Sequence, residues 1–243
     1  MTRRRWIADR WTANSATLLE EQAAHLARVL RAQVGQEFDI VAGHAVRRGI
    51  IEKVAADAVE FSLHEEVAAG ESLPLIVGLG IVRFERMEWA IEKLTELGVA
   101  RIVPLMARRS EKHLVQAAAK RCERWRKISR ESAQQSRRSQ VPGISDPMSV
   151  VDCIAESQNA LRLLLSEQER RRSLWESLVS TDRNAMASSE IYVTIGPEGG
   201  WTPEEISSFA ESGWQSVSLG KNILRTETAA IAVASLIGAW WNG

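Results

Sequence analysis

The chain has 243 residues, of which 45% are hydrophobic and 26% are charged, an ordinary composition for a globular protein. Its 31 Lys and Arg residues balance its 31 Asp and Glu residues, so any RNA binding must come from local basic patches rather than from net charge. The two cysteines, Cys122 and Cys153, lie far apart, and the 4 histidines show no ligand spacing. These patterns argue against a disulfide framework and against a metal site.

Neither end of the sequence has the pattern of a targeting or membrane segment. The basic start, MTRRRWIADRW, lacks the apolar core of a signal peptide. The most apolar stretch, AAIAVASLIGAWW, is too short to span a bilayer. We therefore expect a cytoplasmic protein.

Residues 1–70 are predicted to form a small, mostly β module. The segment LLEEQAAHLARVLR has helical spacing, with Leu19, Ala23, Leu26 and Leu30 on one face. Short alternating runs after Gly35 predict strands in EFDIVAG, VRRGIIEKV and AVEFSLHEEV.

From about residue 73 the pattern changes to strands that alternate with helices. Strands are predicted in LPLIVGLGI, ARIVPLMA, ALRLLLSE, EIYVTIG and WQSVSLG, and helices in RMEWAIEKLTELG, in a long basic segment, after WTPEE, and from Thr226 to Trp241. Such alternation is typical of an α/β fold with a mostly parallel sheet that is covered on both faces. In such sheets ligands bind where loops follow the carboxyl ends of the strands.

The segment IYVTIGPEGGWTPEEI combines a short, buried strand with a glycine-rich loop and a helix start. Thr202 has the makings of an N-cap, with Pro203 in the first helical position and Glu205 closing a capping box. Gly196, Gly199 and Gly200 allow the backbone to face a ligand closely. A tight turn with nothing bound is the alternative. Phosphate binding fits poorly, because the loop lacks the P-loop lysine and GxGxxG patterns and carries Glu198.

Three loops are expected to meet at the carboxyl edge of the sheet: the one that begins at Ser166, the GPEGG loop, and LGKNILRTETA. Ile223 and Leu224 interrupt the last, polar loop, which suggests that they line a pocket. In the alternative, both plug the core while Arg225 pairs with Glu227 on the surface.

The motif IGPEGGWTPEEI, followed at short range by LGKNILRTETAA, resembles the RsmE-type ribosomal RNA methyltransferases of the SPOUT superfamily. The segments HLARVLR, ERMEWAIEKLTELGV and ESAQQSRRSQVPGI agree with that family in the same order. The resemblance implies a PUA-like β-barrel RNA-binding domain at 1–70 and, at 73–243, a SPOUT α/β methyltransferase domain whose C-terminal chain forms a trefoil knot.

The same resemblance implies that the protein methylates N3 of a uridine in small-subunit 16S rRNA, with S-adenosylmethionine as methyl donor. A neutral adenine and a sulfonium cation call for backbone hydrogen bonds and apolar walls rather than for lysines. The expected donor-binding residues are Leu165, Ser166, Ile195, Gly196, Glu198, Gly199, Leu219, Gly220, Ile223 and Leu224.

Transfer of a methyl group to uracil N3 requires loss of the imide proton, and hence a base or groups that stabilise the uracil anion. Arg225, beside the donor pocket, is the candidate for orienting the base or stabilising its charge. Glu227 is a candidate proton acceptor, although it could instead cap the last helix.

RNA affinity is expected from local cations. Residues 120–138 carry eight Lys or Arg against two Glu, and RRRW at the N-terminus adds to them. The expected RNA-binding residues are Arg5, Arg124, Lys127, Gln135 and Arg138. In the alternative, the charged face of this helix is merely solvated, with Trp125 and Ile128 buried beneath it. The helix can have this structure and also bind RNA. Trp6 and Trp11 could stack on bases or belong to the core.

The family resemblance also implies a homodimer. Adjacent tryptophans in LIGAWW cannot both face one core, so one of them could anchor an interface. Two other functions stay open: a SPOUT enzyme with another RNA target, such as a ribose 2′-O methyltransferase, and a non-catalytic RNA-binding protein. The ribose enzymes usually end their last motif in an Asn/Ser-rich loop, which ILRTETAA does not resemble.

Overall fold

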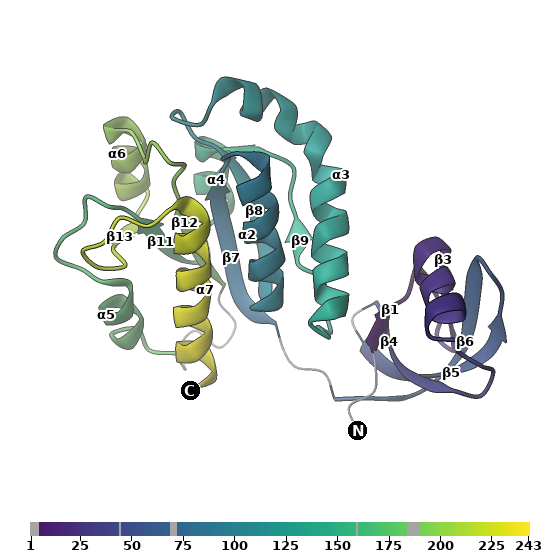
Figure 1. The fold of residues 1–243 in the computed structure, drawn as a ribbon. Coiled ribbons are helices and arrows are strands. Elements are labelled where there is room, and N and C mark those ends of the chain that lie inside the picture. The colour runs from purple at the N-terminus through teal and green to yellow at the C-terminus, as the bar shows by residue number, and fades with distance from the viewer. Residues whose placement is uncertain (1–4, 44, 69–71, 159, 184–189) are drawn as a thin grey trace. The chain divides into compact units, whose positions relative to one another are not determined.

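The computed structural model describes the whole chain except residues 1–4, 44, 69–71, 159 and 184–189 (Figure 1). The chain divides into two compact units. The first contains residues 1–71 together with 133–140, and the second contains residues 72–132 together with 141–243.

The described strands of the first unit form one 6-stranded sheet in the order β1-β4-β5-β6-β3-β2. All neighbouring strands run antiparallel except β1 and β4. The core of this unit contains Trp6, Leu18, Leu26, Ile40 and Phe61. The strands are β1 (Arg5–Ile7), β2 (Arg10–Trp11), β3 (Ser15–Leu19), β4 (Glu37–Ala42), β5 (Ala45–Val54) and β6 (Ala58–Glu66), which confirms the three strands predicted after Gly35.

The helix predicted in LLEEQAAHLARVLR is shorter than expected. Leu19 ends β3, and the helix consists of α1 (Glu20–Ala24) continued by a π-helical turn, η1 (His25–Val29). Glu20 has a positive φ of 48°, and its backbone N–H donates to the Asp57 carbonyl. Strand pairing therefore takes Leu19 out of the helical face, whereas Leu26 remains fully buried as predicted.

The second unit is built on a 7-stranded sheet in the order β10-β8-β7-β12-β11-β13, with β9 also paired to β8. Every described pairing in it is parallel, as predicted. The strands are β7 (Leu73–Gly80), β8 (Val99–Met106), β9 (Gly143–Ile144), β10 (Met148–Ser149), β11 (Leu161–Leu165), β12 (Ile191–Ile195) and β13 (Gln215–Val217).

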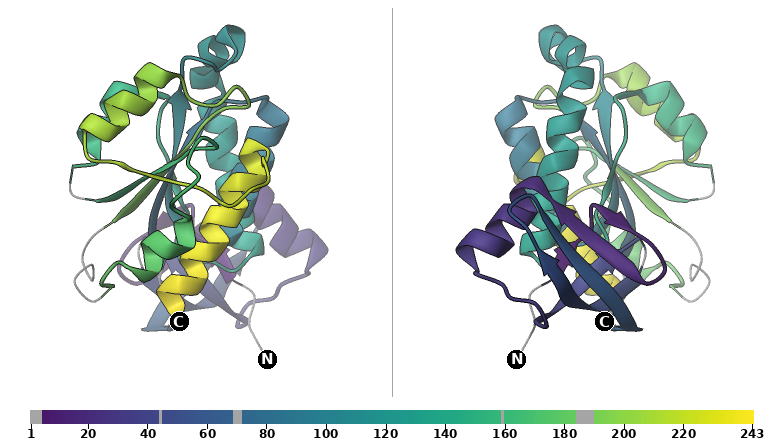
Figure 2. Two further views of the ribbon diagram at one scale, coloured as in Figure 1. Left: turned by 90° about the vertical axis from the view of Figure 1, so that its left-hand side faces the viewer. Right: turned by 90° about the vertical axis from the view of Figure 1, so that its right-hand side faces the viewer.

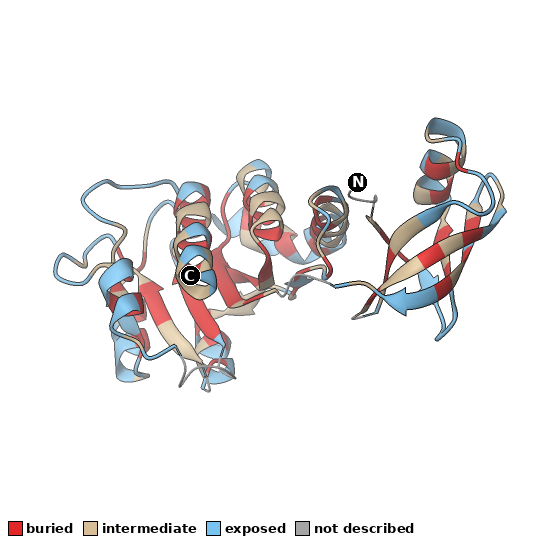
Figure 3. Ribbon diagram, turned by 90° about the horizontal axis from the view of Figure 1, so that it is seen from below, coloured by how far each residue is buried: buried red, intermediate tan, exposed pale blue. Residues whose placement is uncertain are grey.

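Helices cover both faces of this sheet (Figures 2 and 3). Val77 and Val193 belong to one buried cluster with residues of α2, α3, α5 and α7, whereas Ile76 and Tyr192 belong to another with residues of α4 and α6. This alternation follows from the two-residue period of a strand. The helices are α2 (Phe84–Glu96), α3 (Lys112–Gln135), α4 (Val150–Glu156), α5 (Leu174–Val179), α6 (Pro203–Glu211) and α7 (Thr226–Asn242).

The short elements β9, β10, α4 and α5 were not predicted. The capping box at the start of α6 is confirmed, because Thr202 accepts from the Glu205 N–H and the Glu205 carboxylate accepts from the Thr202 N–H. Within the described part of the chain, no helix is both long and apolar enough to cross a membrane.

The expectation that Trp240 and Trp241 cannot share one core is wrong. Both side chains are partly buried and pack against the same hydrophobic cluster of the second unit. Their ring centroids lie 6.0 Å apart. The large indole rings reach the cluster from adjacent positions of the last helical turn, so their adjacency gives no argument for an interface.

Candidate active site

The loops that follow β11, β12 and β13 meet at the carboxyl edge of the sheet and line a cavity of about 260 Å³. This convergence was predicted from the strand pattern. Nine of the residues proposed as donor-binding or catalytic lie in the lining, and they are Leu165, Ser166, Ile195, Gly196, Glu198, Leu219, Ile223, Leu224 and Arg225.

Two of the residues expected in the donor site, Gly199 and Gly220, do not belong to the lining. A Cβ on Gly199 would lie 3.0 Å from the Cβ of Arg109, so this glycine permits close packing between two loops. Gly200, not Gly199, has the left-handed backbone, with a φ of 67°. Gly220 has a φ of 110° with nothing near its missing Cβ, so it serves the turn itself.

Most of the other lining residues were not predicted from the sequence. Ile206 and Ala229 reach the cavity from the first turns of α6 and α7. Each lies four residues after the N-cap of its helix. Residues four apart lie on the same face of a helix, so this spacing could have identified them as neighbours of the cap residues. The other missed residues are loop neighbours of predicted ones: Glu167, Gln168, Pro197, Trp201, Asn222 and Thr226. Gly200, whose backbone is expected from the sequence to face a ligand, also lies in the lining.

Side-chain hydrogen bonds to backbone carbonyls connect the three loops. Thr226 Oγ1 donates to the Gly196 carbonyl at 2.9 Å, and Trp201 Nε1 donates to the Leu165 carbonyl at 3.0 Å. Gly80, at the end of β7, lets the GPEGG loop lie against the sheet, because a Cβ there would be 2.5 Å from Pro197 N. The cavity wall is therefore held by these two hydrogen bonds and by the close approach of the loop to Gly80, which has no side chain.

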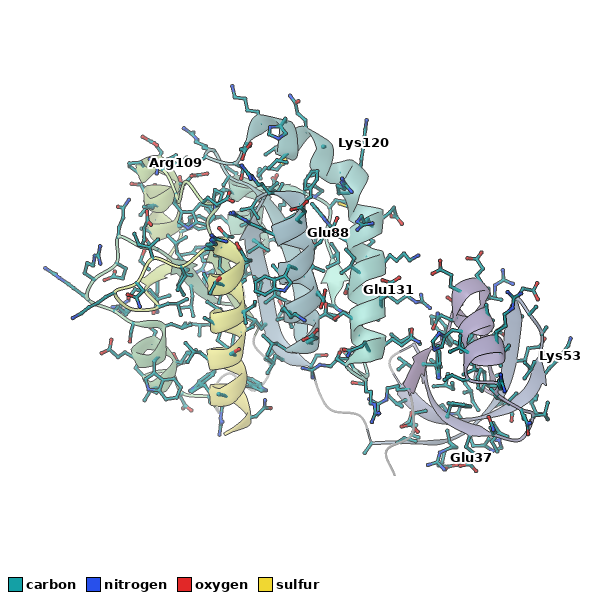
Figure 4. All side chains as sticks on the ribbon, in the orientation of Figure 1. Glu37, Lys53, Glu88, Arg109, Lys120 and Glu131 are labelled. Atoms are coloured by element: carbon teal, nitrogen blue, oxygen red, sulfur yellow. The ribbon has the colours of Figure 1, made fainter. Side chains whose placement is uncertain are left out.

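The loop after β8, residues 107–111, also supports the GPEGG loop. Arg109 Nη1 donates to the Gly199 carbonyl, and the Arg108 N–H donates to Glu205 Oε1, both at 2.8 Å. Figure 4 labels Arg109 at this edge of the sheet. The rule that loops gather at the carboxyl ends of strands could have pointed to this loop, because β8 is part of the same sheet.

Ile223 is 80% exposed and Leu224 is 37% exposed, so the alternative in which they plug the core is wrong. Both line the cavity, and large apolar side chains exposed together are typical of a surface that a ligand covers. Arg225 is exposed in the same lining.

Glu227 differs from Arg225, because it does not belong to the described lining of the cavity. Its side chain is 6% exposed, and its Oε1 lies 3.8 Å from Nε of Arg86 on α2. The Arg225–Glu227 pairing that the alternative required is replaced by a pairing with Arg86.

The basic surface on α3 is partly neutralised by acids. Arg124 donates two hydrogen bonds to the Glu88 carboxylate, at 2.7 and 2.9 Å, and Figure 4 shows Glu88 on α2. Lys127 lies 3.7 Å from Glu131 on the same helix. Beneath this face, Trp125 is fully buried, as the solvated-face description predicted, whereas Ile128 is only partly buried.

The remaining residues proposed to bind RNA lie in the first unit. Arg5 donates to the Arg137 carbonyl at 2.7 Å and lies 3.8 Å from Asp39, so it ties β1 to residues 133–140. Gln135 is exposed, whereas burial lowers the pKa of Arg138. Trp6 is a core residue and Trp11 is 53% exposed, so of the two only Trp11 is accessible for stacking.

Comparison with known proteins agrees with this architecture. The family model for the RNA methyltransferase domain matches residues 70–238. A ribosomal RNA small subunit methyltransferase E from Bacillus subtilis is 29% identical over 93% of this chain and 90% of its own length. The protein of the same name from Synechocystis is 33% identical over 93% of this chain and 73% of its own length.

Solved structures give the same result at the level of the fold. The crystal structure of a ribosomal RNA small subunit methyltransferase E from Neisseria gonorrhoeae bound to S-adenosyl methionine has a TM-score of 0.83, with 26% identity over 99% of this chain and 98% of that one. A Legionella pneumophila protein in complex with SAM has a TM-score of 0.81, with 27% identity over 98% of both chains. The chain therefore belongs to the RNA methyltransferase family that includes the small subunit methyltransferases E.

Proposed function

We propose that the protein uses S-adenosylmethionine to methylate N3 of a uridine in the 16S rRNA of the small ribosomal subunit, and hence works in the cytoplasm. The observation that carries the proposal is the three-loop cavity, with exposed Ile223 and Leu224 in its wall, in a chain of this methyltransferase family. The choice of uridine N3 follows from the resemblance of the GPEGG and ILRTET motifs to the RsmE-type enzymes.

The cavity fits the proposed donor. Its wall combines the apolar side chains of Leu165, Leu219 and Ile223 with the backbone of the GPEGG loop, which suits an adenine and a ribose. Glu198, whose carboxylate also pairs with Arg86, lies in the same wall and is compatible with a positively charged donor. When bound, S-adenosylmethionine supplies an electrophilic methyl group on its sulfonium sulfur.

The residues of the chain must then position the uracil and stabilise the charge that develops on it. Arg225 is exposed in the cavity wall and forms no ion pair among the described residues, so its guanidinium is available to the uracil oxygens. A donor aimed at developing negative charge lowers the barrier to transfer. Glu227 remains the second candidate, as proton acceptor, because its Oε2 forms no hydrogen bond with any described group.

We assign RNA binding to the first unit and to α3. Arg5, Arg124, Lys127, Gln135 and Arg138 would contact mainly phosphates, which position the RNA without reading its sequence. We further propose that residues 1–70 form a PUA-like RNA-binding domain and that residues 73–243 form a SPOUT domain. The 6-stranded sheet of the first unit supports the former assignment.

A trefoil knot in the second unit is part of the same proposal. After β13, at one edge of the sheet, the chain returns to α7, which packs against β7 and α2 (Figure 2). Leu219 and Leu224, on this return, line the cavity together with the loops after β11 and β12. This crossing supports a knot, an arrangement that protein folds in general avoid.

The proposed homodimer rests on the family resemblance. Light scattering at micromolar concentration should give about twice the mass of the 27.0 kDa chain. A fully active monomer would contradict it.

Mass spectrometry of 16S rRNA from cells with and without this gene tests the proposed function. We expect N3-methyluridine at one position to disappear without the gene and to return with the wild-type gene. Loss of a ribose 2′-O methyl group instead would support the other SPOUT activity. Calorimetry with S-adenosylmethionine tests the non-catalytic alternative, because a module without a donor site releases no heat.

A further inference from the structure

Arg86 connects two carboxylates that come from different parts of the second unit. Its Nη1 lies 2.5 Å from Oε1 of Glu198 in the GPEGG loop, and its Nε lies 3.8 Å from Oε1 of Glu227 in the first turn of α7. Glu198 belongs to the cavity lining, whereas Arg86 and Glu227 do not. We infer that Arg86 is a positioning residue, which holds the GPEGG loop in place by linking its Glu198 to Glu227 at the start of α7.

The two ion pairs differ in burial. The Glu227 side chain is 6% exposed, and its Oε2 forms no hydrogen bond with a described group. Removal of the cation from a buried carboxylate leaves an uncompensated charge, which is strongly unfavourable. Glu227 therefore attracts the guanidinium of Arg86 at 3.8 Å, and this attraction is electrostatic because no hydrogen bond joins the two side chains.

The Glu198 side chain is 38% exposed, and an ion pair at that exposure contributes little by itself when both side chains must be ordered. Here Arg86 is held from two sides, by the attraction of buried Glu227 and by the hydrogen bond to Glu198, so the entropic cost of ordering its side chain is shared between the two pairs. The short contact then fixes the side chain of a residue in the cavity wall. A second link between the same two segments, from Thr226 to Gly196, supports this coupling.

This inference rests on the proposed function, because the ligand of the cavity is taken to be S-adenosylmethionine. It assigns to Glu227 a role that differs from proton acceptance. A residue that holds the GPEGG loop in place affects how tightly the donor binds, whereas a general base affects the rate of methyl transfer once donor and RNA are bound.

Calorimetric titration of the full chain with S-adenosylmethionine tests the inference. Arg86→Gln should weaken donor binding roughly tenfold, within the range of coupling found between contacting residues. Glu227→Gln should weaken it to a similar degree although it does not line the cavity. The double variant should bind no more than about twofold more weakly than either single variant, because both changes break the same link.

Arg83→Gln is the matched control, because Arg83 is an exposed arginine at the N-cap of the same helix without a side-chain capping bond. It should bind the donor like the wild type. Addition of methylguanidinium to Arg86→Ala should restore part of the affinity, which a general loss of packing would not allow. Urea unfolding of each variant identifies misfolding. Should Arg86→Gln fail to fold, Glu198→Gln, at the exposed end of the link, should show the same tenfold loss, within that coupling range.

Wild-type donor affinity in folded Arg86→Gln, or in Glu198→Gln, would overturn the inference and leave the proposed function intact. So would a Glu227→Gln variant that binds the donor normally and loses only the rate of transfer, because Glu227 would then act as a base. Failure of the wild-type protein to bind S-adenosylmethionine would contradict the proposed function itself.

Discussion

Thr226 and Gly196 are joined by a hydrogen bond in which Thr226 Oγ1 donates to the Gly196 carbonyl oxygen at 2.9 Å. Thr226 is the first residue of α7, and Gly196 follows β12 directly. The bond therefore connects the last helix to the loop that forms one wall of the cavity.

Replacement of this hydroxyl should cost stability. Thr226 is 4% exposed, so Thr226→Val keeps the shape of the side chain but leaves the Gly196 carbonyl without its partner. We expect the free energy of unfolding to fall by about 1–3 kcal/mol, measured by urea denaturation. Thr226→Ser, which keeps the hydroxyl, is the control and should lose less. Equal losses in both variants would mean that the methyl group, not the hydrogen bond, matters.

Gly80→Ala should disturb the GPEGG loop although Gly80 lies outside the cavity lining. The new Cβ would be 2.5 Å from Pro197 N and 2.8 Å from the carbonyl carbon of Gly196, both backbone atoms, so the loop must move. We expect a loss of about 1–3 kcal/mol in unfolding free energy, and weaker donor binding by calorimetry. Gly143→Ala is the matched control, because its Cβ would meet Arg101 Cγ at an ordinary 3.6 Å. Similar effects in the two variants would contradict this prediction.

Arg124 and Lys127 should contribute to RNA affinity and not to chemistry. The double change to Ala should weaken RNA binding and reduce its salt dependence by up to about two phosphate contacts, with the rate at saturating RNA nearly intact. Glu88→Gln offers a sharper control, because it removes the carboxylate that holds Arg124 and should strengthen RNA binding slightly. An unchanged salt slope in the double variant would show that this face does not contact the RNA.

Arg225→Ala should have the opposite effect. An interaction made chiefly in the transition state appears in turnover and not in ground-state binding. We expect the single-turnover rate at saturating RNA to fall roughly 10²-fold, as after loss of one charge-stabilising donor, with a modest loss of RNA affinity. Arg225→Lys, which keeps the charge, should retain part of the rate. A wild-type rate in Arg225→Ala would show that the residue is an RNA contact or structural.

Cys153 should make the protein less stable at alkaline pH. Burial raises the pKa of its thiol from the ordinary 9.0 to about 11. The unfolded chain therefore releases this proton first, so the contribution is complete below pH 9.0 and is lost progressively up to about pH 11. The loss should amount to about 2–3 kcal/mol. Urea denaturation between these pH values should show a flatter dependence for Cys153→Ala than for the wild type.

Local sequence patterns determined most of the elements of the second unit. The strand of residues 191–195 and the capping box at Thr202 follow from short-range rules, namely alternating branched residues and reciprocal hydrogen bonds within one helical turn. The meeting of three loops could also be predicted, because parallel strands bring their carboxyl ends to one edge.

Tertiary structure decided what depends on neighbours far away in the sequence. The partner of Glu227 is Arg86 on another helix, and the partner of Gly199 is Arg109 after another strand. The sequence placed both Glu227 and Gly199 at the cavity itself. Spacing along the chain identifies which residues share a loop, but the direction in which each side chain points depends on the elements that pack against that loop. Burial and charge pairing, which give these residues their roles, therefore arise only when the sheet has brought its loops together.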